Sequence, residues 1–210
     1  MTRNLLLLML AAVSVAAYFT PAVASATPWH INSTGTFSVN GGTVIWSGAS
    51  GFTFDCQAVS GSGNYTSTTG GTLTLTMGTC STGSLGHCTS PGEPTGSFVT
   101  TTLAFDNVML GIGTPGILLT PNAETGVFSH FNCGFITKIE GNGLIGTMTS
   151  PSCSQVGTTA KWSFRSTAHG SQQHTKYTGT VYSWKRGAES LAIDMEMTVT
   201  YPQTKIATCT

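Results

Sequence analysis

Side-chain character alternates most clearly in the segment Leu191-Ala192-Ile193-Asp194-Met195-Glu196-Met197-Thr198-Val199. Every second residue from Leu191 to Val199 is aliphatic or a methionine, and the residues between them are small, charged or hydroxylated. Successive side chains of a strand point to opposite faces, so this two-residue period predicts a β-strand with one buried and one solvated face. The same alternation recurs from Leu73 to Met77, with threonines on the second face.

The rest of the chain repeats this pattern in short segments separated by Gly, Pro, Asn and Ser. A strand holding Trp162 and Phe164 on one face is expected, and the other expected strands are residues 35–39, 43–47, 51–58, 97–105, 117–120, 127–133, 136–140, 144–149 and 175–184. Short strands at this spacing are typical of antiparallel proteins. The sequence therefore predicts an all-β fold, an antiparallel β-sandwich or β-barrel stapled by disulfides.

Charged residues are scarce: they make up 8% of the 210 residues, with 8 Lys+Arg against 8 Asp+Glu. An ordinary soluble domain carries roughly a quarter. A nucleic-acid-binding protein needs a basic stripe to replace the counterions of the phosphates, and this chain has none, so no nucleic-acid partner is expected. The low content of helix-forming residues argues equally against a helical bundle.

The first 26 residues have the three parts of a secretory signal. Arg3 supplies the positive region, residues 5–19 supply the apolar region, and Ala24-Ser25-Ala26 supplies the small-residue cleavage site. An apolar stretch of that length is too short to span a bilayer. We therefore expect a signal peptide at residues 1–26 and a single all-β domain at residues 27–210, with an internal seam near residues 89–96 and no membrane span after signal removal. The expected location is extracellular or at the cell envelope.

Six cysteines follow the predicted signal, and an even number in a secreted chain indicates disulfides. Fifteen pairings of six cysteines exist, and the sequence does not choose among them. Short loops favour Cys80–Cys88 and Cys133–Cys153, which leaves Cys56–Cys209 to tie the last strand back. A zinc site is disfavoured because the chain has no C-x-x-C pair.

No sequence motif assigns a catalytic residue, a metal or a cofactor. The G-x-G-x-x-G matches at residues 111–116 and 141–146 do not open a helix, so they are interpreted as turns. His169 and His174 flank a polar turn and are more consistent with a hairpin than with a metal site. Asp194 and Glu196 lie two residues apart on one strand face, which is within the carboxylate spacing of a retaining glycosidase. Glycosidases usually draw this pair from separate elements beside an aromatic-lined cleft, so an ordinary solvated face is the favoured interpretation.

Aromatic residues offer a possible contact surface. Trp46 and Trp162 lie in alternating strands and are expected in the core. Tyr182 and Trp184 share a face with hydroxylated residues of the expected strand 175–184, so they are the better candidates for exposure and ligand contact. Thr72, Thr74 and Thr76 form a row of hydroxyl groups on one face of the strand expected around Leu73–Met77.

The order of motifs after Cys80 adds a resemblance. It runs through Gly86-His87-Cys88-Thr89-Ser90-Pro91-Gly92, Leu118-Leu119-Thr120-Pro121-Asn122-Ala123, Phe131-Asn132-Cys133, residues 141–147 and Thr149-Ser150-Pro151-Ser152-Cys153. These motifs resemble those of a broad group of uncharacterised, secreted, Thr- and Gly-rich actinobacterial proteins with paired cysteines. The resemblance covers about two thirds of the mature chain. It implies a scaffold, and it carries over no catalytic residue.

Three functional hypotheses follow. The first is a non-enzymatic secreted or envelope-associated protein that displays a rigid, mostly uncharged, hydroxyl-rich surface to envelope components or carbohydrate. The second is a secreted polysaccharide hydrolase that uses Asp194 and Glu196. The third is an extracellular carrier that holds an apolar ligand inside a barrel.

Overall fold

The computed structural model describes residues 29–208, apart from residue 84, residues 122–124, residue 135 and residues 151–155. The expected signal peptide, Cys153 and Cys209 lie outside this part of the chain. The described residues form strands joined by turns, which confirms the all-β prediction. Among them there is no helix with the length and apolarity needed to cross a membrane.

Eight antiparallel strands close into a barrel, which decides between the two predicted architectures. Each strand pairs with the next in the order given below, and the last pairs again with the first. Closure leaves no free strand edge in the barrel. The strands are β2 (Gly35–Gly41), β5 (Ala58–Tyr65), β6 (Gly70–Gly78), β10 (Leu103–Gly111), β11 (Thr114–Thr120), β14 (Leu144–Ser150), β15 (Val156–Phe164) and β21 (Glu189–Thr208).

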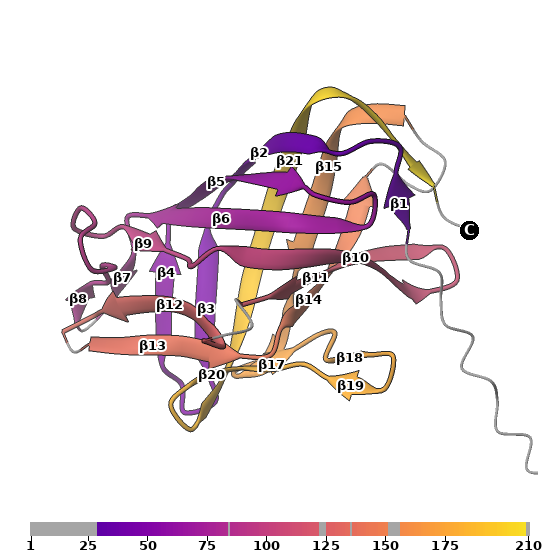
Figure 1. The fold of residues 1–210 in the computed structure, drawn as a ribbon. Coiled ribbons are helices and arrows are strands. Elements are labelled where there is room, and N and C mark those ends of the chain that lie inside the picture. Colours follow the sequence, from indigo (N-terminus) through magenta and orange to yellow (C-terminus); the bar gives the residue numbers. More distant parts are fainter. Residues whose placement is uncertain (1–28, 84, 122–124, 135, 151–155, 209–210) are drawn as a thin grey trace, which may run out of the picture.

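A second antiparallel sheet shares the long strand β21 with the barrel. Residues Leu191 to Asp194 pair with β3, whereas the strand from Met195 onward pairs with β15, so β21 passes from one sheet to the other at this point. Figure 1 shows β21 in yellow, running from the β20 end of the molecule to the opposite end. In pairing order the second sheet contains β12 (Val127–Asn132), β13 (Ile136–Gly141), β20 (Trp184–Arg186), β21, β3 (Val44–Gly48), β4 (Thr53–Cys56), β7 (Ser81–Thr82) and β8 (Gly86–His87).

The remaining strands are short. They are β1 (His30–Ile31), β9 (Phe98–Val99), β16 (Ser166–Ala168), β17 (Ser171–Gln172), β18 (Lys176–Tyr177) and β19 (Thr180–Val181). The single strand predicted at residues 175–184 is wrong, because β18 and β19 form a hairpin and β20 follows separately. Thr178 and Gly179 have positive φ angles, as a two-residue hairpin turn requires.

Aromatic side chains fill the barrel. Phe37, Tyr65, Phe105 and Trp162 are buried there, and their ring centroids lie 4.7–5.9 Å apart. The inward positions of β5 include Gly63, where a Cβ atom would collide with the Phe37 ring. The described interior of the barrel is therefore packed with side chains, which argues against the hypothesis of an apolar-ligand carrier.

Two disulfides connect residues that face each other across antiparallel pairs. Cys56 bonds to Cys80, and Cys88 bonds to Cys133. The predicted pairs Cys80–Cys88, Cys133–Cys153 and Cys56–Cys209 are therefore wrong. Cys56 precedes β5 and Cys80 follows β6, so the β5–β6 hairpin brings the two together, although they are 24 residues apart. Cys88 and Cys133 adjoin the bridge between Thr89 and Asn132, which joins the two ends of the second sheet.

Candidate functional site

An arm made of residues 165–183 carries the two small hairpins and lies against β21. Gln172 attaches it: its side-chain oxygen accepts a hydrogen bond from the Ile193 N–H (2.9 Å), and its Nε2 donates to the Ile193 carbonyl (3.1 Å). Gly170, with φ near +71°, passes so close to Ala49 and Ser190 that a Cβ atom would lie 2.7 Å from their backbone atoms. Glycine and one amide side chain thus fix the arm closely to the sheet.

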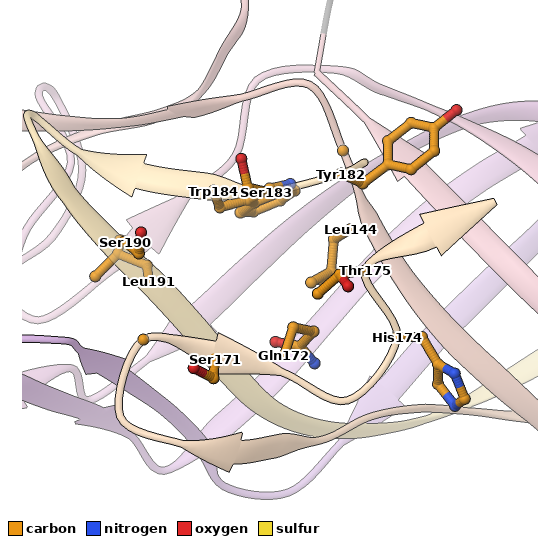
Figure 2. Close-up of a pocket in the computed structure, with 12 residues that line it drawn as sticks. Leu144, Ser171, Gln172, His174, Thr175, Tyr182, Ser183, Trp184, Ser190 and Leu191 are labelled. Carbon is orange, nitrogen blue, oxygen red and sulfur yellow. The ribbon is translucent and has the colours of Figure 1, made fainter. Parts of the chain in front are cut away.

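A pocket of about 160 Å³ lies between this arm and the sheets, and we name it the arm pocket. Figure 2 shows Ser171, Gln172 and Thr175 entering from the arm, and Ser190 and Leu191 from β21. The lining also includes Leu144, Ser183, Tyr182 and Trp184. No Asp, Glu, Lys or Arg is among the residues that line it. The arm pocket combines neutral hydrogen-bonding groups with apolar surface.

His174 is the only histidine in the lining. Burial lowers its pKa below that of a free histidine, so the imidazole is neutral at pH 7. Burial, and after it the nearby Tyr182 and Asp106, raises the pKa of Tyr177, the neighbouring tyrosine of the arm. At neutral pH the arm pocket therefore presents an uncharged wall.

The two predicted contact residues, Tyr182 and Trp184, line this same pocket. The expected exposure of Trp184 is wrong: the residue is 2% exposed, and its ring centroid lies 3.9 Å from that of Phe128. It belongs to β20, where Trp184 packs into the core against Trp46 and Phe128 while Lys185 is exposed. Tyr182 is half-buried and packs against a small apolar cluster on the outside of the barrel, formed by Val108, Leu118 and Ile145.

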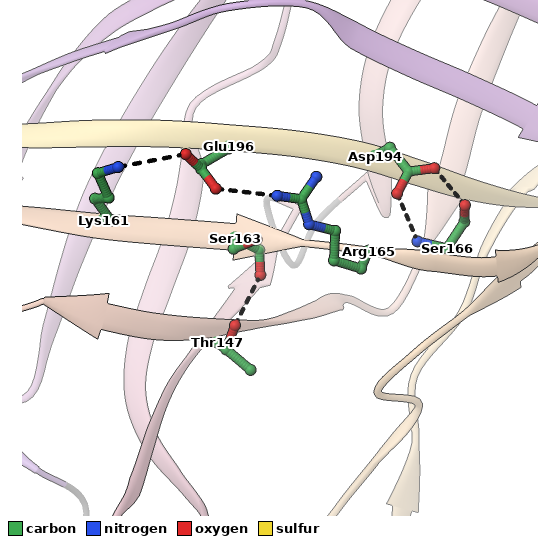
Figure 3. Close-up of polar contacts among 7 residues, drawn as sticks. All are labelled: Thr147, Lys161, Ser163, Arg165, Ser166, Asp194 and Glu196. Carbon is green, nitrogen blue, oxygen red and sulfur yellow. Dashed lines mark hydrogen bonds and ion pairs between the residues drawn. The ribbon is translucent and has the colours of Figure 1, made fainter.

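The carboxylates proposed for hydrolysis hold neighbouring strands together. Asp194 accepts hydrogen bonds from the backbone N–H (3.0 Å) and the hydroxyl of Ser166, which anchors the start of the arm. Glu196 forms ion pairs with Arg165 (3.0 Å) and Lys161 (3.6 Å), as Figure 3 shows. Neither carboxylate lines the arm pocket, so the structure does not bring them together with the aromatic residues.

The histidines are dispersed through the described residues. His169 and His174 lie on the same arm, but only His174 lines the arm pocket. No group of three or more His, Cys, Asp or Glu side chains within the described ranges is arranged to hold a metal ion.

A second candidate surface lies on the outside of the barrel, over β2, β5 and β6. Each strand places three neutral hydroxyl or amide side chains outward, and we name the set the hydroxyl face. Its members are Thr36, Ser38, Asn40, Ser60, Ser62, Asn64, Thr72, Thr74 and Thr76. They are exposed or half-buried. The sequence pattern identified only the β6 row.

Strand register aligns these side chains into rows. Ser38 lies opposite Ser62, and Ser62 lies opposite Thr74. On the other side of β2 the same row continues to Thr200 of β21 and from there to Thr159 of β15. Neighbouring residues in a row are about 4.8 Å apart, and successive rows are about 6.8 Å apart. The result is a regular, uncharged array across adjacent strands.

A shallow groove of about 300 Å³ crosses the hydroxyl face. Thr36, Ser62, Asn64, Thr72 and Thr74 line it, together with Thr102 of the neighbouring loop. Because Gly61 and Gly63 occupy the inward positions of β5, that strand shows no apolar alternation, and sequence reasoning missed it. The glycine pattern S-G-S-G next to a predicted strand was the available signal.

Comparison of the chain with protein-family models, with curated proteins and with solved structures gives no match. The two surfaces described above are therefore the basis for a functional proposal.

Proposed function

We propose that this protein is a secreted, non-enzymatic β protein that binds neutral polysaccharide of the cell envelope through its hydroxyl face. The observation that carries the proposal is the in-register array of uncharged hydrogen-bonding side chains on three adjacent strands. A typical protein surface contains about 25–35% charged residues. An ordered patch without any charge suits a ligand that also has none.

The energetics favour a repeating ligand over a single small molecule. A neutral hydrogen bond exchanged with water contributes only about 0.5–1.5 kcal/mol. One sugar unit on an exposed face therefore binds weakly, whereas a polymer that contacts several rows gains from its high effective concentration. The closed barrel supports this mode, because it keeps the rows in a fixed geometry.

The disulfides support a location outside the cytoplasm. Cys56–Cys80 and Cys88–Cys133 are the kind of bond that persists in oxidising compartments. Together with the signal-like residues 1–26, they favour export.

Co-sedimentation with insoluble polysaccharide tests the proposal. We expect the wild-type protein to pellet with an insoluble neutral glucan or with chitin, and to do so equally at low and high salt, because no charge pairing is involved. Binding to the corresponding carboxymethylated glucan should be no stronger. Failure of the wild-type protein to bind any neutral polymer would remove the proposal.

Two face variants give the matched comparison. Ser62→Lys and Thr74→Lys place a hydrated ammonium at the centre of the array, where the two residues lie opposite each other. Each should weaken binding about tenfold or more, which corresponds to about 1.4 kcal/mol. Thr53→Lys, an exposed position on β4 in the second sheet, is the control and should bind like the wild type.

A further inference from the structure

The arm pocket carries an inference that does not depend on the hydroxyl face. We infer that it binds a single neutral sugar ring. Its walls alternate apolar surface, from Leu144, Leu191 and Trp184, with hydroxyl groups from Ser171, Thr175 and Ser190. A sugar ring has the same division, with C–H faces and hydroxyl edges. The pocket therefore matches the ligand in chemical character.

The size of the pocket limits the ligand. Its volume of about 160 Å³ equals that of about five water molecules at their liquid volume. Drug-sized ligands occupy pockets of about 300–1,000 Å³. The arm pocket thus has room for one small ring, and a longer chain would extend out past the arm.

The charge of the pocket limits the ligand further. No lining residue is acidic or basic apart from His174, whose pKa is lowered by burial. A carboxylated or phosphorylated sugar would lose its hydration without gaining a partner of opposite charge. The predicted ligand is therefore an uncharged sugar.

Trp184 supplies a second, independent observation. Its side chain is buried and lines the pocket, and its indole Nε1–H has no hydrogen-bond partner among the described residues. Buried polar groups are almost always hydrogen-bonded, because an unpaired donor loses its water without compensation. A ligand oxygen, or a water molecule held by the ligand, would supply the missing acceptor.

The arm fixes this pocket in place before a ligand arrives. Gln172 bonds to both backbone groups of Ile193, and Asp194 accepts the Ser166 N–H, so the arm is held against β21 at two points. Side chains that are already ordered lose little conformational freedom on binding.

Ligand-observed NMR and isothermal titration with the full chain test this inference. Glucose, arabinose and N-acetylglucosamine are the neutral probes, and glucuronate is the charged comparison. We expect saturable binding of at least one neutral sugar in the millimolar range, a change in tryptophan fluorescence, and no binding of glucuronate. Absence of saturable binding for all three neutral sugars would overturn the inference.

Variants locate the binding. Ser171→Leu fills the pocket from an exposed position and should abolish sugar binding without unfolding the protein. Trp184→Phe keeps an aromatic ring but removes the N–H donor, and it should weaken binding about tenfold. Trp162→Phe is the matched control: Trp162 also has an unpaired buried N–H but does not line the pocket, so binding should stay at the wild-type level. Sugar binding that survives Ser171→Leu unchanged would contradict the inference.

The two proposals fail separately. Ser62→Lys should reduce polymer co-sedimentation and leave monosaccharide binding intact, whereas Ser171→Leu should do the reverse. A wild-type protein that binds monosaccharides but no polymer would retain the arm pocket and remove the role of the hydroxyl face.

Discussion

Removal of the Cys88–Cys133 disulfide should cost a large part of the stability of this protein. The bond closes a loop of 45 residues. In the chain-entropy treatment, a loop of that length removes about 13 cal/mol/K from the unfolded state, or about 4 kcal/mol at 25 °C. The same treatment gives about 3.4 kcal/mol for the 24-residue separation of Cys56–Cys80. The Cys88–Cys133 bond should therefore be the more important of the two.

The position of the bond adds a spatial prediction. Among the described residues, the two ends of the second sheet are joined here by the single backbone bridge between Thr89 and Asn132 and by a hydrogen bond from the Ser90 hydroxyl to the His130 carbonyl (2.8 Å), whereas the barrel is closed by full strand ladders. In the double variant Cys88→Ala/Cys133→Ala, we expect the β7–β8 region to lose hydrogen-exchange protection first. The barrel strands should keep theirs until global unfolding.

Urea unfolding followed by circular dichroism measures the effect. The expected loss of about 4 kcal/mol corresponds to a fall of about 8–16 °C in Tm for a chain of this size. Cys56→Ala/Cys80→Ala is the comparison and should lose slightly less. A double variant that unfolds within about 1 kcal/mol of the wild type would refute the loop-closure reasoning, as would equal loss of protection in the barrel and in β7–β8.

Three further predictions concern packing, charge and the remaining cysteines. Gly63→Ala should destabilise the protein by about 1–3 kcal/mol, because the new methyl group collides with the Phe37 ring; Gly42→Ala, with open space around it, should stay within about 0.5 kcal/mol in the same urea assay. Glu189 has a side chain that is 14% exposed, and it bonds to Arg186 (2.6 Å) and to the Ser50 N–H (2.9 Å). Burial alone would raise the pKa of Glu189, but these partners lower it overall. The ionised carboxylate therefore adds to the free energy of unfolding above the pKa of a free glutamate, and this stabilisation is lost as the pH falls through the pKa of the folded state. Glu189→Gln should cost about 2 kcal/mol at pH 7 and reduce the acid-induced loss, whereas Glu196→Gln, whose ion pairs are about half exposed, should cost less than about 1 kcal/mol. Non-reducing peptide mapping should find a third disulfide between Cys153 and Cys209, the two cysteines left after the observed pairs; free thiols at these positions would contradict complete oxidation.

The alternation of apolar and polar residues was sufficient to predict the strands that carry side chains larger than glycine on both faces. β21 and β6 alternate apolar and polar residues, and both form ladders over the predicted residues. β5 was missed because its two central inward positions are Gly61 and Gly63, so the buried side chains of Val59 and Tyr65 are too far apart in the sequence to show an alternation. The space that side chains at the two glycines would fill is taken by Phe37 and Leu75 from neighbouring strands, which no local pattern can show.

The disulfide pairing was predicted wrongly for a similar reason. Short sequence separation favoured Cys80–Cys88. A long β-hairpin, however, places residues that are far apart in sequence directly opposite each other in space. The register of β5 with β6 pairs Ala58 with Gly78, and two residues farther out it places Cys56 opposite Cys80. Recognition of β5 in the sequence would have identified this pair.

The candidate site was predicted in part. Tyr182 and Trp184 do line one pocket, but Trp184 is buried. Its exposure was predicted from a continuous strand at residues 175–184, whereas residues 176–181 form a hairpin. Ser171, Gln172 and Ser190 reach the same pocket from segments that are separate in sequence. Their convergence depends on the hydrogen bonds between the Gln172 amide and the backbone of Ile193, a tertiary contact that no local sequence pattern predicts.

The most direct test of the proposed function is an NMR footprint of a soluble neutral oligosaccharide on the full-length protein. The account predicts that amide shifts change along the outward positions of β2, β5 and β6, centred on Ser62 and Thr74, and that the changes are the same at low and high salt. Shift changes confined to other surfaces, or none at saturating oligosaccharide, would contradict the claim that the hydroxyl face is the binding surface.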